Sequence, residues 1–158
     1  MHVLVATDAD WVLAEIRAAL EEPGTSFTVC SDGRAVTNAV KNRTPDVAVL
    51  DLQCGSMGAM AVTMDLRLDE SGGRLPHVPV VMLLDRRADL HLAKRCDAEG
   101  WLIKPLDALR LRRAVAAVTT GKRFTEGMAN PPIDAPAESA DASPEELESP
   151  AGETVSTG

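Results

Sequence analysis

The chain has no tyrosine, and aromatic residues make up only 3% of its 158 residues. No run of about 18 apolar residues is present, which excludes a bilayer-spanning helix. The three cysteines, Cys30, Cys54 and Cys96, are odd in number and widely spaced. We therefore expect reduced thiols in a cytosolic compartment rather than disulfides or a zinc site. Because 45% of the residues are hydrophobic, we expect a core of Val, Leu, Ala and Met.

Basic residues are absent from the C-terminal segment 124–158. All 16 Lys and Arg lie in residues 1–123 with 16 of the 24 acids, so the remaining 8 acids supply the whole net charge of −8. Neither part offers the basic face that nucleic-acid binding requires, and we expect no nucleic-acid partner. The segment is rich in Pro, Ala, Ser and Glu, which predicts disorder unless a partner holds it. We place a folded domain at 1–121 and an acidic tail without an effector domain at 122–158.

Apolar runs and helical spacings alternate along residues 1–121. The runs are nearly continuous, as is typical of strands buried on both faces of a parallel sheet. The segments after them carry apolar residues at helical spacing. The expected strands are 2–6, 27–30, 47–50, 79–84 and 101–103, and the expected helices are about 10–20, 32–42, 57–70, 86–97 and 107–120. This alternation predicts a doubly wound α/β domain with five parallel strands.

Two of the helices allow more specific predictions. Asp85 precedes the fourth helix and is expected to cap it. In the third helix Met57, Met60, Met64 and Leu68 recur on one side, which we expect to belong to the core.

Two strands end in side chains of opposite charge. The run VAVLD ends at Asp51, and GWLIKP carries Lys104 followed by Pro105. Because the carboxyl ends of parallel strands line one crevice, we expect the carboxylate and the ammonium group to meet there. Such a pair can accept and neutralise a phosphoryl group. A lysine at a strand end is commonly only solvated, but Asp8 stands at the end of a third strand and favours a site.

With these strand ends, the element order and the spacings, residues 1–121 resemble the receiver domain of bacterial response regulators (CheY-like). The resemblance implies a flavodoxin-like fold with strand order 2-1-3-4-5 and a signalling domain rather than an enzyme. It implies that Asp51 accepts a phosphoryl group from a phosphohistidine or a small phosphodonor. It also implies that Lys104 pairs with Asp51 and that the bond to Pro105 is cis, as it often is in the family.

Members of this family hold Mg²⁺ with an acidic pair after the first strand, the phosphoryl acceptor and a backbone carbonyl two residues beyond it. These positions correspond to Thr7 and Asp8, Asp51, and the backbone of Gln53. Thr7 replaces one acid of the pair, so the resemblance implies weaker Mg²⁺ binding. We expect no cofactor to be required.

Three further positions depart from the family pattern. Leu84 replaces the Ser or Thr whose hydroxyl binds the phosphoryl oxygen. Asp85 replaces a small residue, and its carboxylate would repel a phosphoryl group, whether or not it also caps a helix. Trp101 takes the place of the aromatic switch residue and is expected to pack or to anchor a partner. Beside the site, Cys54 is either a redox handle or, as we favour, a packed thiol.

Two functions are compatible with this pattern. The first is an atypical single-domain receiver, or pseudo-receiver, that binds proteins as an accessory subunit of a large assembly. An orphan receiver-like subunit of bacterial respiratory complex I is a protein of this type. The second is a functional single-domain response regulator, phosphorylated on Asp51 by a histidine kinase with Mg²⁺. Thr7, Leu84 and Asp85 favour the first function, whereas Asp8, Asp51 and Lys104 favour the second.

The family commonly binds partners through the face formed by the fourth helix, the fifth strand and the fifth helix. Here the expected partner-binding residues of that face are Trp101, Arg86, Arg87, Arg95, Arg110 and Arg113. Both functions place the protein in the cytoplasm without direct membrane insertion. The first would bring it to the inner membrane through its partner complex.

Overall fold

The computed structural model describes residues 1–126, and the predicted disordered tail lies outside this part from residue 127 onward. Within residues 1–126, no helix has both the length and the apolar character needed to cross a bilayer. The strands are β1 His2–Ala6, β2 Ser26–Cys30, β3 Val47–Asp51, β4 Val80–Leu84, β5 Gly100–Ile103 and β6 Phe124–Thr125. The helices are α1 Asp10–Leu20, α2 Val36–Asn42, α3 Ala59–Ser71, α4 Leu90–Arg95 and α5 Ala108–Thr119, with 3₁₀ turns at Gly33–Ala35 and Arg87–Asp89.

The strands form one parallel sheet in the order β2-β1-β3-β4-β5-β6. The predicted order 2-1-3-4-5 is thereby confirmed, and the two-residue strand β6 is added beside β5. Phe124 N donates to Glu99 O at 3.0 Å, so the folded domain continues past the expected end at residue 121. The dipeptide of β6 is too short to show a period of two, which is why its sequence gave no strand signal.

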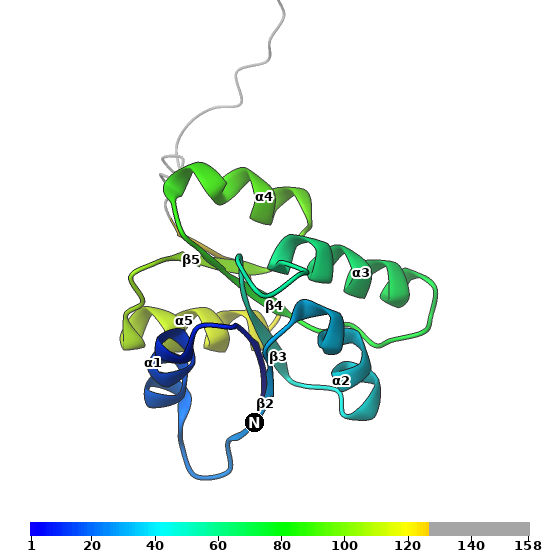
Figure 1. The fold of residues 1–158 in the computed structure, drawn as a ribbon. Coiled ribbons are helices and arrows are strands. Elements are labelled where there is room, and N and C mark those ends of the chain that lie inside the picture. The colour runs from blue at the N-terminus through cyan, green and yellow to red at the C-terminus, as the bar shows by residue number, and fades with distance from the viewer. Residues whose placement is uncertain (127–158) are drawn as a thin grey trace, which may run out of the picture. The chain divides into compact units, whose positions relative to one another are not determined.

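Helices cover the sheet on both faces, with α1 and α5 on one side and α2, α3 and α4 on the other (Figure 1). Alternate side chains of each strand enter the two layers. In β1, for example, Leu4 packs toward α2 and α3, whereas Val3 and Val5 pack toward α1 and α5. Both faces of the central strands are therefore dry, which explains their nearly continuous apolar sequences.

The prediction that the methionine side of α3 belongs to the core is wrong for its C-terminal half. Met64 is 51% exposed and Leu68 is 61% exposed. The helix instead buries the stripe that contains Val62 and Leu66. Both stripes have helical spacing and both are apolar, so periodicity alone could not decide which one faces the sheet.

The prediction that Asp85 caps the fourth helix is also wrong. The helical segment begins with the 3₁₀ turn Arg87–Asp89, and α4 follows only at Leu90. Asp89, which is buried, accepts a hydrogen bond from Arg86 N at 3.1 Å and so satisfies the start of the turn. The side chain of Asp85 is directed to Lys104 instead.

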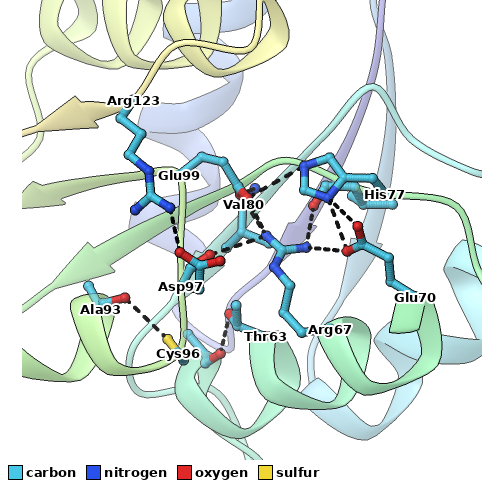
Figure 2. A network of polar contacts seen from close by, with 12 residues as sticks. Thr63, Arg67, Glu70, His77, Val80, Ala93, Cys96, Asp97, Glu99 and Arg123 are labelled. Atoms are coloured by element: carbon cyan, nitrogen blue, oxygen red, sulfur yellow. Dashed lines mark hydrogen bonds and ion pairs between the residues drawn. The ribbon is translucent and has the colours of Figure 1, made fainter. Parts of the chain in front are cut away.

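A polar network ties α3 to the amino-terminal ends of β4 and β5 (Figure 2). The Arg67 guanidinium donates to both carboxylate oxygens of Glu99, at 2.7 and 2.6 Å. Glu99 also accepts from Val80 N at 2.7 Å, and Arg67 donates to Val78 O at 3.1 Å. Bidentate charge-assisted bonds fix geometry strongly. This network therefore fixes the amino-terminal ends of β4 and β5, at the opposite end of the sheet from Asp51 and Lys104.

Two leucines of α3 provide a matched test of the observed packing. We expect Leu66→Ala to lower the free energy of unfolding by about 2–5 kcal/mol, because it leaves a cavity against the sheet. Leu68→Ala removes the same atoms from an exposed site and should change it by no more than about 0.5 kcal/mol. Urea unfolding followed by circular dichroism measures both. Equal losses would contradict the assignment of the buried stripe.

Candidate functional site

The carboxyl ends of β3 and β5 bring together the two charged residues singled out in the sequence. Lys104 Nζ lies 2.6 Å from Asp51 Oδ1. The Asp51 side chain is 2% exposed and that of Lys104 is 12% exposed. The Lys104–Pro105 peptide bond is cis. Lys104 is thus paired with the carboxylate rather than merely solvated, and the contact is a charge-assisted hydrogen bond.

A second carboxylate shares the lysine. Asp85 Oδ1 lies 2.9 Å from Lys104 Nζ, so the ammonium group bridges the ends of β3 and β4. Burial by itself lowers the pKa of Lys104, but the hydrogen bonds and negative charges of Asp51 and then Asp85 outweigh it and raise that pKa above its usual value. Lys104 therefore stays an ammonium ion at physiological pH.

The other oxygen of Asp51 is bound by a neighbouring strand. Thr7, which follows β1, donates its hydroxyl proton to Asp51 Oδ2 at 2.9 Å and accepts from Ala9 N at 3.2 Å. Thr7 is itself buried. Both carboxylate oxygens of Asp51 consequently have partners within the protein.

Two acids near the site hold the loop that follows β3. Asp8 Oδ2 accepts from Gly55 N at 3.1 Å. Asp32 Oδ2 accepts from the Ser56 hydroxyl at 2.7 Å, and its other oxygen accepts from Arg34 N at 2.9 Å. The Arg34 amide, followed by the Ser56 hydroxyl, lowers the pKa of Asp32. Asp32 and Ser56 were not predicted as neighbours of the site, because only the folded loop brings them together.

The thiol of Cys54, a residue of the same loop, is packed inside the protein. It is buried, and burial, followed by the negative charges of Asp8 and Asp51, raises its pKa to about 11. Since the thiolate is the nucleophilic form, the side chain is unreactive near neutral pH. The geometry favours the packed thiol over the redox handle.

Leu84 and Trp101, which depart from the family pattern, both lie in the core. Leu84 is fully buried in β4 and offers no hydroxyl to the crevice. Trp101 is 2% exposed, and its indole Nε1 donates to Glu126 O at 2.9 Å. Of the two expectations for Trp101, packing or anchoring a partner, the structure supports packing, because the side chain belongs to the core between β4 and β6.

A second tryptophan stands beside the crevice, although the sequence gave no reason to choose it. Trp11 is exposed in the first turn of α1, and Lys104 Nζ lies 5.8 Å from the centroid of its ring. This distance is within the range of a cation–π interaction. In the sequence, only the short distance of Trp11 from the end of β1 indicates that it lies near the strand ends.

The arginines predicted for the partner-binding face have different environments. Arg86, Arg87, Arg95 and Arg113 are exposed. Arg110 is half-buried, and its guanidinium contacts Glu126 and the carbonyl oxygens of Ile103 and Pro105. The cationic part of the face thus consists of α4, the turn before it and the outer side of α5.

The predicted Mg²⁺ ligands are only partly suited to that ion. Asp8 and Asp51 supply carboxylates, and Gln53 would supply a carbonyl, all of which are oxygen donors of the kind that Mg²⁺ prefers. However, Asp51 Oδ2 is bound by Thr7, and Asp8 is bound by Gly55. Among residues 1–126, no three His, Cys, Asp or Glu side chains gather as a metal-binding group. The residues present thus supply oxygen donors for Mg²⁺ but one carboxylate fewer than the family pattern, which favours weak binding.

Comparison with known proteins identifies one family. Its sequence model, the response regulator receiver domain, matches residues 3–116. The chain is 32% identical over 143 residues to the transcriptional regulatory protein CseB of Streptomyces avermitilis, covering 89% of this chain but 57% of that protein. The chain thus spans little more than half the length of this relative. Protein PilH of Pseudomonas aeruginosa is 25% identical over 120 residues, covering 76% of this chain and 98% of that one.

A solved structure shows the same fold. The receiver domain of the sensor histidine kinase PA1611 from Pseudomonas aeruginosa, with a magnesium ion coordinated in its active site cleft, superimposes with a TM-score of 0.65 at 21% identity. The match covers 75% of this chain and 97% of that domain. It confirms the flavodoxin-like, CheY-like architecture expected from the sequence.

Restoring the missing acid should restore metal affinity. We expect Thr7→Asp to tighten Mg²⁺ binding about tenfold or more, because it adds a carboxylate and removes the hydroxyl that binds Asp51. Isothermal titration calorimetry measures the dissociation constant. Thr7→Asn is the matched control, since it removes the hydroxyl without adding charge. An equal gain in Thr7→Asn would show that the charge is not responsible.

Proposed function

The chain belongs to the response regulator receiver family, and from that membership we propose that it is an atypical receiver, a protein-binding accessory subunit whose phosphoryl switch is impaired. The observation that carries this proposal is the full engagement of Asp51. One of its oxygens is bound by Lys104 and the other by Thr7. Each of these bonds draws electron density from the carboxylate, so Asp51 should attack phosphorus less readily than a carboxylate without such partners.

Asp85 opposes the transfer electrostatically. It already occupies the ammonium group that would neutralise incoming phosphoryl oxygens. It also places a negative charge where those oxygens would arrive. Two like unit charges 4 Å apart near a protein surface repel by about 4 kcal/mol, before the screening that its partial exposure allows. Solvent screening and the pairing with Lys104 reduce this repulsion, and the part that remains would slow phosphorylation.

Leu84 and Trp101 oppose the transmission of a phosphorylation signal. An arriving phosphoryl group would find no hydroxyl at the end of β4, because Leu84 is apolar and fully buried. Trp101 already lies inside the domain, with its indole nitrogen bonded to Glu126. The two groups that usually move together in the family therefore have no shared ligand here.

A second candidate function is that of a working response regulator, phosphorylated on Asp51 by a histidine kinase. It is supported by the carboxylate of Asp51 and the ammonium group of Lys104, which meet at the strand ends as in the family pattern, and by the names of the relatives. CseB is called a transcriptional regulatory protein, but residues 1–123 of this chain are electrically neutral. We therefore propose protein partners rather than nucleic acid.

Intact mass spectrometry after incubation with acetyl phosphate or phosphoramidate and Mg²⁺ separates the two functions. We expect no stoichiometric adduct in the unaltered protein. The double variant Thr7→Asp, Asp85→Ala should gain about 80 Da, the mass of HPO₃, because it supplies the metal-side acid and frees Lys104. Asp51→Asn added to the double variant should abolish the gain. A stoichiometric adduct in the unaltered protein, absent in Asp51→Asn, would make the working regulator the correct function.

The accessory role predicts that the tagged full-length protein is recovered from native lysate within a larger complex. Respiratory complex I stays our predicted assembly, and mass spectrometry of the co-purified subunits tests it. Charge reversal at Arg95 and Arg113, which are exposed on the proposed face, should reduce recovery at least fivefold. Arg34→Glu, exposed beside α2, is the control. Recovery only as a free monomer would exclude the accessory role.

A further inference from the structure

The outer edge of β5 is covered by the last residues that the structure describes. Phe124 N donates to Glu99 O at 3.0 Å, and β6 runs parallel to β5 with Phe124 opposite Gly100. A free edge strand presents unpaired backbone groups that invite another chain to pair with it. Residues 124–126, which we call the edge latch, satisfy those groups from within the same molecule.

Glu126 makes the tightest contacts of the edge latch. Its carboxylate Oε2 accepts from Ile103 N at 2.9 Å and from the Arg110 guanidinium. Its backbone oxygen accepts from Trp101 Nε1 at 2.9 Å. The carboxylate therefore takes the place that a strand carbonyl would occupy beside Ile103, one step beyond the end of β6.

The groups that contact Glu126 form a cluster of hydrogen-bond donors. The backbone amide of Ile103, the guanidinium of Arg110 and the indole of Trp101 all donate hydrogen bonds. Arg110 also donates to Ile103 O at 3.1 Å and to Pro105 O at 3.2 Å. Because these last two bonds do not involve Glu126, they would keep the guanidinium in place if the latch left.

The residue that precedes the edge latch is held only weakly. Arg123 pairs with Asp97 at 2.5 Å (Figure 2), and this hydrogen bond lowers the pKa of Asp97. Both side chains are exposed, and exposed ion pairs contribute little to stability. With only two residues in β6, opening costs few backbone bonds.

We propose that the edge latch closes the β5 edge in cis, and that a protein partner docks there by inserting an extended segment whose carboxylate replaces that of Glu126. Strand addition would supply the backbone bonds, and the Ile103 amide with the Arg110 guanidinium would select an acidic residue. The proposal builds on the proposed protein-binding function by naming the surface and the chemistry of the partner segment.

Hydrogen exchange tests the closure in the full-length protein. We expect Glu126→Ala to speed exchange of the Ile103 amide at least tenfold and Glu126→Gln to have an intermediate effect, because glutamine keeps an acceptor but loses the charge. Glu15→Ala, an exposed change in α1, is the control. Unchanged exchange at Ile103 in Glu126→Ala would overturn the closure.

A peptide tests the docking. The probe is the capped hexapeptide GKRFTE, identical to residues 121–126, with GKRFTQ as its control. Added to full-length protein carrying Trp11→Phe, so that Trp101 alone reports by fluorescence, it should bind the Glu126→Ala variant at least tenfold more tightly than the parent.

GKRFTQ should bind more weakly than GKRFTE. Fast exchange of the Ile103 amide in Glu126→Ala without peptide binding would overturn docking of an acidic segment. Equal binding of the two peptides would also overturn it. Neither result would alter the outcome of the phosphodonor experiment, so failure of this proposal and failure of the proposed function remain distinguishable.

Discussion

The arrangement of the site depends on the need of one buried carboxylate for a cation. Asp51 is almost fully enclosed at the end of β3, where an unpaired charge would cost several kcal/mol. Lys104 supplies the counter-charge, but it comes from beyond β5, two strands away in the sheet. The side chain must therefore reach across the end of β4, which explains why Asp85, at that end, shares it. Asp85, which departs from the family pattern, thus stabilises the ammonium group of Lys104 in this position.

The replacements around Asp51 form a consistent set. Thr7 has no charge to bind a metal, and its hydroxyl donates a hydrogen bond to Asp51 instead. Asp85 satisfies Lys104. A buried polar group that has its partners inside the protein needs no metal or phosphoryl ligand to compensate it. The crevice therefore has the two central charges expected of a receiver, and each is paired within the protein.

The sequence predicted the fold and the central ion pair well because both depend on strong local signals. Nearly continuous apolar strands that end in Asp51 and Lys104 leave little freedom in a parallel sheet. The predictions were wrong where the same residue or spacing was compatible with two structures. Asp85 was equally suited to cap a helix or to bind lysine. Met64 and Val62 both had helical spacing, and only packing against the sheet chose between their stripes. The hydrogen-bond partner of Trp101 is Glu126, 25 residues later, and no local pattern connects the two.

The end of β5 connects the crevice to the outer edge of the sheet. Lys104 belongs to the crevice, whereas the residues on either side of it, Ile103 and Pro105, bind the guanidinium of Arg110 through their carbonyl oxygens. Arg110 in turn binds Glu126 of the edge latch. Leu84 is apolar and fully buried, so it offers no hydroxyl that could link the crevice to this edge. The backbone of residues 103–105 remains as a direct covalent link, so a ligand that drew Lys104 away from Asp85 would act on the same segment that holds the edge latch closed.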